Sequence, residues 1–172
     1  GNASAQYNLG LRYGLGQGVP QDYKEAVRLF RLAADQGSAD AQYALGVMYN
    51  SGQGVPQDYK EAVRLYRPAA DQGGADAQYN LGLMNDTAPG VPHAYKEAVP
   101  LHRLAADQGN AAAQYNLGLM YNNGQGVPQD YKEAVRLYRL AAGQADADAQ
   151  YSLGVMYGSG QGVPQDYKEA VR

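Results

Sequence analysis

The sequence predicts an all-α protein, an α/α superhelix (solenoid) of 36-residue helix-turn-helix repeats. Two repeated groups of letters and one periodicity support this prediction. The triplet AQY returns every 36 residues, at Ala5, Ala41, Ala77, Ala113 and Ala149. The group YKEAV keeps the same spacing, at Tyr23, Tyr59, Tyr95, Tyr131 and Tyr167. Apolar residues between these groups recur at helical spacing, so we expect two helices in each repeat.

The repeats follow one another without an insertion. We place them at 5–40, 41–76, 77–112 and 113–148, with a partial repeat at 149–172. A single helix pair cannot bury both of its faces, whereas stacked copies can. We therefore expect the chain to form one solenoid over residues 1–172.

The first helix of each repeat is predicted from its cap and from one buried face. In the second repeat, Ser38 is suited to cap the helix N-terminus. Ala41, Leu45 and Met48 then share one side of the helix, because helical residues turn by about 100° each. The glycines of the following GQGVPQ segment break this helix and form a loop.

The second helix begins at an aspartate. Asp58 is suited to the N-cap, and Glu61 three residues later completes a capping-box pattern. Apolar and aromatic residues then line one side of the helix, while Lys60 and Arg64 belong to a solvated outer face. Gly73 suits the left-handed position after the helix end.

These residues resemble the Sel-one-like repeat family, which is related to the tetratricopeptide repeats. The family pattern is AxxxLGxxYxxGxGVxxDxxKAxxxYxxAAxxG, stretched by a residue in places. In the second repeat it is matched by Ala41, Leu45, Gly46, Tyr49, Gly52, Gly54, Val55, Asp58, Ala62, Tyr66, Ala69, Ala70 and Gly73. The resemblance implies a superhelix whose first helices line a concave face. It also implies a non-catalytic role in assembling protein complexes, as in bacterial envelope, signalling and host-contact proteins.

A candidate binding surface follows from the open side of the first helices. Opposite the buried side, the helical wheel places Tyr43, Gly46, Val47 and Asn50. Rigid tyrosine rings beside amide groups are suited to holding an extended peptide. The candidate site residues are Tyr7, Tyr43, Tyr79, Tyr115, Tyr151, Asn50, Asn80, Asn116 and Asn122. The alternative is that these tyrosines only pack between neighbouring first helices, which Gly46 would allow to approach closely.

The composition gives little support to other classes of function. The formal charge is −3, which predicts no nucleic-acid partner, and no apolar run is long enough to predict membrane insertion. Cysteine is absent, and His93 and His102 have no ligand-like spacing, so we expect no metal, no cofactor and no enzyme activity. A cell-envelope glycan-binding module using the tyrosines is the alternative function. No signal peptide precedes Ala3, and the compartment stays open between bacterial periplasmic or secreted and cytoplasmic locations.

The third repeat departs from the others at several positions. Ala94 replaces the capping aspartate, Pro100 replaces an arginine, and His102 replaces a core tyrosine. The destabilisation by Pro100 would be smaller if the second helix restarted with Pro100 as its first residue, a position that proline tolerates. The departures are explained either by tolerated drift or by a hinge or modified surface around 85–93. At the two ends of the chain, incompletely covered repeats predict end-to-end self-association.

Overall fold

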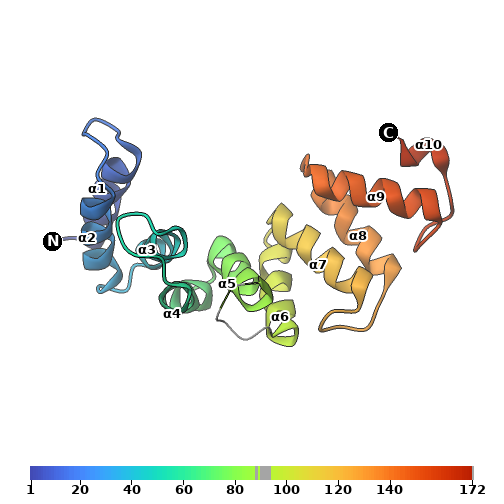
Figure 1. Cartoon of the computed structure of the whole chain (residues 1–172), viewed down its shortest axis with the longest axis horizontal. Helices are drawn as coiled ribbons and strands as arrows, with labels where there is room; N and C mark the ends of the chain where they lie inside the picture. The colour runs from blue at the N-terminus through green and yellow to red at the C-terminus, as the bar shows by residue number, and fades with distance from the viewer. Residues whose placement is uncertain (88, 90–93, 172) are drawn as a thin grey trace. The chain divides into compact units, whose positions relative to one another are not determined.

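The computed structural model describes residues 1–87, 89 and 94–171, and within them every regular element is an α-helix. This confirms the all-α prediction and its helix-turn-helix repeats. Contacts between residues divide the chain into two compact units, Gly1–Pro92 and His93–Arg172. The prediction of one solenoid over 1–172 stays a prediction. The helices are α1 (Ala3–Leu15), α2 (Tyr23–Ala34), α3 (Ala39–Ser51), α4 (Tyr59–Asp71), α5 (Ala75–Thr87), α6 (Tyr95–Asp107), α7 (Ala111–Asn123), α8 (Tyr131–Ala142), α9 (Ala147–Ser159) and α10 (Tyr167–Ala170) (Figure 1).

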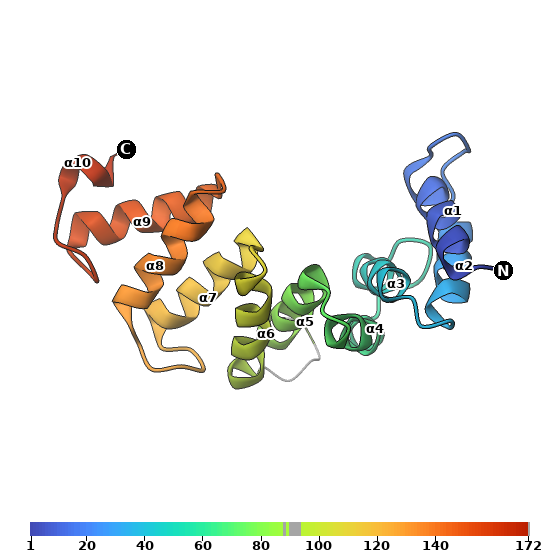
Figure 2. The ribbon, with the colours of Figure 1, turned by 180° about the vertical axis from the view of Figure 1, so that it is seen from behind.

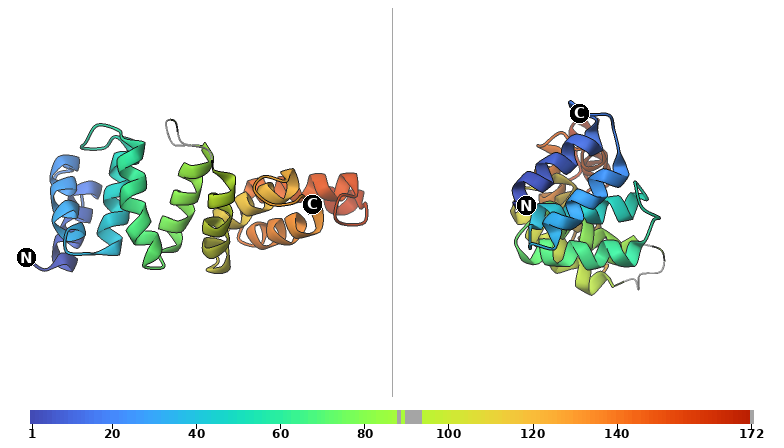
Figure 3. Two further views of the ribbon diagram at one scale, coloured as in Figure 1. Left: turned by 90° about the horizontal axis from the view of Figure 1, so that it is seen from below. Right: turned by 90° about the vertical axis from the view of Figure 1, so that its left-hand side faces the viewer.

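In the first unit, each helix from α1 to α4 packs against the next one along the chain (Figure 3). The core lies between first and second helices, where Phe30 and Ala33 of α2 meet Leu45 of α3 and Leu65 of α4. Alanines dominate the closest approaches, and Ala26, Ala33, Ala41 and Ala62 are fully buried. Small side chains at these positions allow the helices to pack closely.

The second unit repeats this arrangement from α6 to α10. Figure 2 shows α7, α8 and α9 following one another, and each packs against its neighbour in the chain. Its core cluster contains Ala134, Val135, Tyr138 and Met156. The short α10 packs against α9.

The predicted caps of the first helices are present. The Ser38 hydroxyl accepts a hydrogen bond from the Ala41 amide at 3.3 Å. This satisfies one of the amides that lack a partner within the helix. The same bond is made at α1, α7 and α9 by Asn2, Asn110 and Asp146.

The glycines and the last glutamine of the GQGVPQ loop have defined structural roles. Gly52 ends α3 at a φ of 71°, and its amide bonds to the Met48 carbonyl, as a left-handed helix cap requires. Gly126 has a positive φ as well, and a Cβ there would lie 2.6 Å from the carbonyl oxygen of Tyr95. Gln57 donates to the carbonyl of Asn50 at 2.7 Å, so the loop folds back onto the helix that it leaves.

The second helices are capped by aspartate, but the predicted capping box is only half formed. Asp58 accepts from the amides of Lys60 and Glu61, both at 3.0 Å. The Glu61 carboxylate pairs with Arg64 at 2.6 Å instead of returning to the Asp58 amide. That amide donates to the Tyr49 carbonyl at 3.0 Å, so it is already satisfied by the first helix. The outer position of Lys60 and Arg64 is confirmed, because both are exposed.

The second helix of the third repeat keeps its full length. Helix α6 runs unbroken from Tyr95 to Asp107 with Pro100 inside it, so it does not restart at the proline. Ala94 makes no side-chain cap, a loss of about 1 kcal/mol. Burial of the inner face explains why the helix persists, since Ala98 and His102 are both fully buried. His102 is therefore a core residue, like Tyr66 at the same position of the second repeat.

The hinge hypothesis concerns residues 85–93, of which 88 and 90–93 lie outside the described residues. His93 is among them. Asn85 is buried in α5, at the position where α3 has Tyr49. The choice between drift and a hinge or modified surface stays open. Among the described residues, no helix is long and apolar enough to cross a bilayer.

Candidate functional site

The position of the candidate tyrosines depends on a glycine in the same helix. Gly46 of α3 is buried against the Tyr66 ring of α4, where a Cβ would lie only 2.7 Å from Cε1 of that ring. The same contact joins Gly10 to Phe30 and Gly118 to Tyr138. The helical wheel placed Gly46 on the open side of α3, and this was wrong. The residue admits the ring of the second helix into the interior of its own repeat.

The buried ring in turn supports the candidate tyrosine one turn earlier. The Tyr43 and Tyr66 rings lie 5.8 Å apart between centroids, tilted by 37°. Tyr7 and Phe30 form an equivalent pair, as do Tyr115 and Tyr138, each also at 5.8 Å. Tilted rings at this separation attract each other beyond the area they bury.

These tyrosines are partly packed and partly exposed. Tyr7, Tyr43 and Tyr115 are half-buried, so one part of each ring packs on the second helix while another part meets solvent. Burial raises the pKa of Tyr43, and the nearby Asp76 carboxylate raises it further. The Tyr43 phenol accordingly stays protonated and neutral near pH 7, able to donate a hydrogen bond.

A cavity of about 290 Å³ opens between α1 and α3 in the first unit. We call it the α1–α3 groove. Tyr7 and Leu11 line it from α1, and Tyr43 and Val47 line it from α3. The Phe30 ring from α2 also lines it. Two predicted site residues thus meet at one mainly apolar surface, the kind of lining that ligand pockets commonly have.

The predicted asparagines have different surroundings. Asn80 of α5 donates to its own helix at Asp76 and, at 3.4 Å, to the Tyr43 hydroxyl. Asn50 is half-buried at the end of α3, and its backbone carbonyl accepts a hydrogen bond from the Gln57 side chain. Asn122 donates to Asn123 at 2.9 Å. The Asn80–Tyr43 hydrogen bond therefore joins a predicted asparagine directly to a predicted tyrosine.

The remaining predicted residues lie at different degrees of exposure. Tyr79 and Asn116 are half-buried on α5 and α7. Tyr151 on α9 is 76% exposed. Binding by any of these residues stays a prediction.

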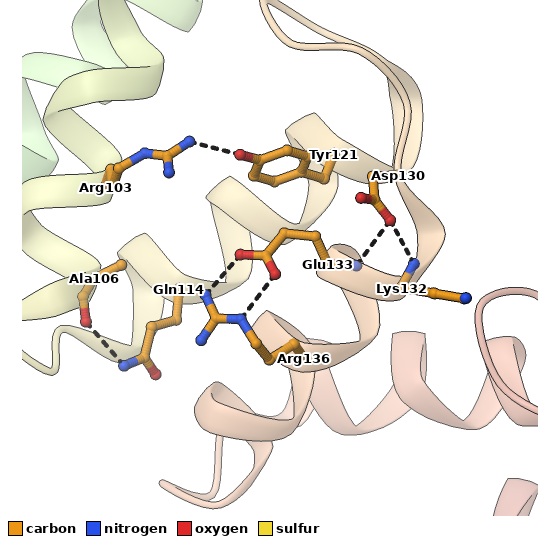
Figure 4. Close-up of polar contacts among 8 residues, drawn as sticks. All are labelled: Arg103, Ala106, Gln114, Tyr121, Asp130, Lys132, Glu133 and Arg136. Atoms are coloured by element: carbon orange, nitrogen blue, oxygen red, sulfur yellow. Dashed lines mark hydrogen bonds and ion pairs between the residues drawn. The ribbon is translucent and has the colours of Figure 1, made fainter.

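Two recurrent polar links between consecutive repeats were not recognised from the sequence (Figure 4). The glutamine of AQY donates to the last turn of the preceding second helix, as Gln114 does to the Ala106 carbonyl at 3.1 Å. An arginine of the second helix donates to a tyrosine of the next first helix, as Arg103 does to the Tyr121 hydroxyl at 2.6 Å. The glutamine, arginine and tyrosine recur at the 36-residue period, which was the available signal. The periodicity alone does not show which of these residues form hydrogen bonds with one another. The arginine link also occurs in Arg31–Tyr49 and Arg139–Tyr157.

The described residues hold no constellation that suggests catalysis at a metal. No group of three or more His, Asp or Glu side chains among residues 1–87, 89 and 94–171 is arranged to hold a metal ion.

Comparison with known proteins places these repeats in a family. A family model for the Sel1 repeat matches at residues 3–38, 39–74, 75–110, 111–146 and 147–172. The matches follow the predicted period of 36, and each starts two residues before the predicted boundary. No curated protein matches the sequence.

Solved structures share the fold across nearly the whole chain. A Sel1 repeat protein from Oxalobacter formigenes is 36% identical, with a TM-score of 0.93 over 99% of this chain and 68% of that one. A protective antigen with an SLR fold, present in uropathogenic Escherichia coli strains, is 41% identical, with a TM-score of 0.93 over 98% of this chain and 36% of that one. An immunity protein from Pseudomonas aeruginosa is 25% identical, with a TM-score of 0.61 over 98% of this chain and 61% of its own. The α/α solenoid class predicted from the repeats is thereby confirmed.

The buried ring under Tyr43 generates a prediction about stability. The Tyr66 hydroxyl is buried without a hydrogen-bond partner, and burial strongly raises its pKa. The first repeat has Phe30 at the same position. We expect Tyr66→Phe to raise the free energy of unfolding by about 1 kcal/mol, because an unpaired buried hydroxyl is costly. Urea denaturation followed by circular dichroism measures it.

The matched control makes the same chemical change where the hydroxyl has a partner. Tyr49 accepts the hydrogen bond from Arg31 at 2.7 Å, so Tyr49→Phe should lower the free energy of unfolding by about 0.5–1.5 kcal/mol. A loss of stability in Tyr66→Phe equal to that in Tyr49→Phe would contradict the interpretation.

Proposed function

Since the chain belongs to the Sel1 repeat family, we propose that it is a non-catalytic scaffold that binds a peptide or protein segment in the α1–α3 groove. Sel1 repeats generally act in protein interactions, which supports the class of function. The observation that carries the proposed location is the meeting of Tyr7 and Tyr43 at one mainly apolar cavity of about 290 Å³.

The chemistry of the groove favours side chains over small polar ligands. Its walls are aliphatic and aromatic, with Leu11, Ala44 and Val47 between the two tyrosines. Covering such a surface releases roughly 25 cal/mol per Å² of apolar area. The half-buried tyrosines are already held by Phe30 and Tyr66, so little rotational freedom is lost when a ligand covers them.

The glycan-binding alternative gains no support. Sugar stacking needs open aromatic faces, whereas Tyr7, Tyr43 and Tyr115 each pack against another ring. The similar structures from Oxalobacter, Escherichia and Pseudomonas do not point to a glycan either. The proposed partner is therefore a peptide or protein segment.

The groove is tested by blocking it without removing a tyrosine that supports the fold. Val47→Arg places a charged, longer side chain in the groove, while Leu32→Arg places the same side chain on the exposed part of α2. A phage-displayed random dodecapeptide library is selected against the wild type, and the enriched peptides are synthesised. Calorimetry then compares their affinities for all three proteins. We expect Val47→Arg to weaken binding by about tenfold or more, since it costs a desolvated apolar contact.

Circular dichroism first establishes that both variants fold. Leu32→Arg should bind the selected peptides as the wild type does. Peptides that bind Val47→Arg as well as the wild type would place the interaction elsewhere and refute the groove as the site. Failure to enrich any peptide would also count against the proposed function.

Self-association is a second part of the proposal, and exposed apolar residues in both units support it. Leu9 of α1 is 40% exposed, whereas Leu45 and Leu81 at the same repeat position are 3% and 2% exposed. On α9, Tyr151 and Val155 are 76% and 49% exposed. Apolar area of this kind favours association between copies.

Sedimentation velocity from micromolar to millimolar concentration tests this association. We expect the sedimentation coefficient to rise with concentration in the wild type and to remain constant in Leu9→Glu. Leu104→Glu, at a position that is 51% exposed on α6, is the control and should behave as the wild type does. A wild-type monomer over the whole range would exclude the association.

A further inference from the structure

A second, smaller cavity adjoins the α1–α3 groove and differs from it in charge. It has a volume of about 150 Å³ and lies between the beginnings of α3 and α5. Asp40, Asp76 and Tyr43 line it, together with small residues such as Gly74 and Ala77. Tyr43 lines both cavities, so the apolar groove and the acidic cavity share one ring.

The charge at this end of the groove is of one sign. Neither a lysine nor an arginine lines either cavity among the described residues. The outer-helix arginines Arg28 and Arg64 are paired with Glu25 and Glu61. The two carboxylates also affect the tyrosines of the groove. Burial raises the pKa of Tyr7 and the Asp40 charge raises it further, and burial and Asp76 do the same for Tyr43.

Helix stability alone does not account for the two aspartates. Acidic residues in a first turn do interact favourably with the helix dipole. At the same position of α7, however, the chain has Ala112, and that helix forms over the same length of 13 residues. The repeats therefore tolerate a neutral residue here. Although α9 again has an aspartate, Asp148, only the first unit has aspartates at this position in two consecutive repeats.

We propose that the segment bound in the α1–α3 groove carries a lysine or arginine next to its apolar side chains, and that this basic group enters the cavity between Asp40 and Asp76. The inference rests on the proposed function of the groove and adds the chemistry of the partner. The apolar side chains cover Leu11 and Val47, and the cation reaches the two carboxylates beside Tyr43. Complementary charge at a rim selects partners and speeds their encounter.

The selection from the dodecapeptide library is repeated with two charge-reversed proteins. Asp40→Lys combined with Asp76→Lys reverses the acidic cavity. Asp35→Lys combined with Asp71→Lys makes the same change in net charge at exposed positions near the ends of α2 and α4, away from both cavities. We expect lysine and arginine beside apolar residues in peptides selected by the wild type and by the control. Aspartate and glutamate should replace them in peptides selected by Asp40→Lys/Asp76→Lys.

The affinities of one selected peptide and of its Lys/Arg→Glu variant measure how much the basic residue contributes to binding. At low salt the basic peptide should bind the wild type about fivefold more tightly, as expected for two exposed charge pairs, and high salt should reduce this ratio. Asp40→Asn/Asp76→Asn, which avoids placing cations at helix N-termini, should bring the ratio close to one.

The outcomes separate this inference from the proposed function. Enriched peptides that are apolar but carry no basic residue, and whose binding Val47→Arg removes, would overturn the acidic-cavity inference and leave the groove standing. An unchanged ratio in Asp40→Asn/Asp76→Asn would overturn it as well. Loss of the Val47→Arg effect would refute the groove, and this inference would fall with it.

Discussion

The contact between a helical glycine and the ring of the following helix is the constraint on which the rest of each repeat depends. At Gly46 the missing side chain lets the Tyr66 ring lie against the α3 backbone. The Tyr66 ring is then completely buried and packs against the Tyr43 ring. The groove exists because this support holds Tyr43 and, through Phe30, Tyr7 at the surface. A fixed helix separation in one repeat thus shapes the α1–α3 groove between two repeats.

Polar bonds add to the apolar contacts between consecutive repeats. The Gln114–Ala106 bond satisfies a carbonyl of a helix end, and the Arg103–Tyr121 bond joins two side chains that are both partly in water. Each contributes about 1 kcal/mol or a little more, so repetition matters more than any single bond. In the third repeat Asn85 stands where a tyrosine would accept such a bond. Burial of residues such as Ala98 and His102 sustains α6 despite Pro100 and the missing cap.

Much of the fold could be predicted because the letters that determine it act locally. Ser38 and Asp58 cap helices through amides only two or three residues away, and Gly52 ends one through its own φ. The errors concern residues whose role depends on a partner distant in sequence. Gly46 was assigned to the wrong face because its contact is a ring twenty residues later. Glu61 was expected to close the cap, but the Tyr49 carbonyl already holds that amide. Of the candidate site, Tyr7 and Tyr43 could be named from the wheel, whereas their meeting in one groove needed the structure.

The most direct test compares two glycines of first helices in the same unit. An added Cβ at Gly46 would lie 2.7 Å from the Tyr66 ring, whereas at Gly14 its only neighbour within 4 Å is the Ala26 Cβ at 3.8 Å. Gly46→Ala should lower the free energy of unfolding by about 1–3 kcal/mol through overpacking. Gly14→Ala should raise it by about 0.5–1 kcal/mol, because alanine favours the helix. Equal stabilisation by both substitutions, measured by urea denaturation, would contradict the central role of the glycine–ring contact.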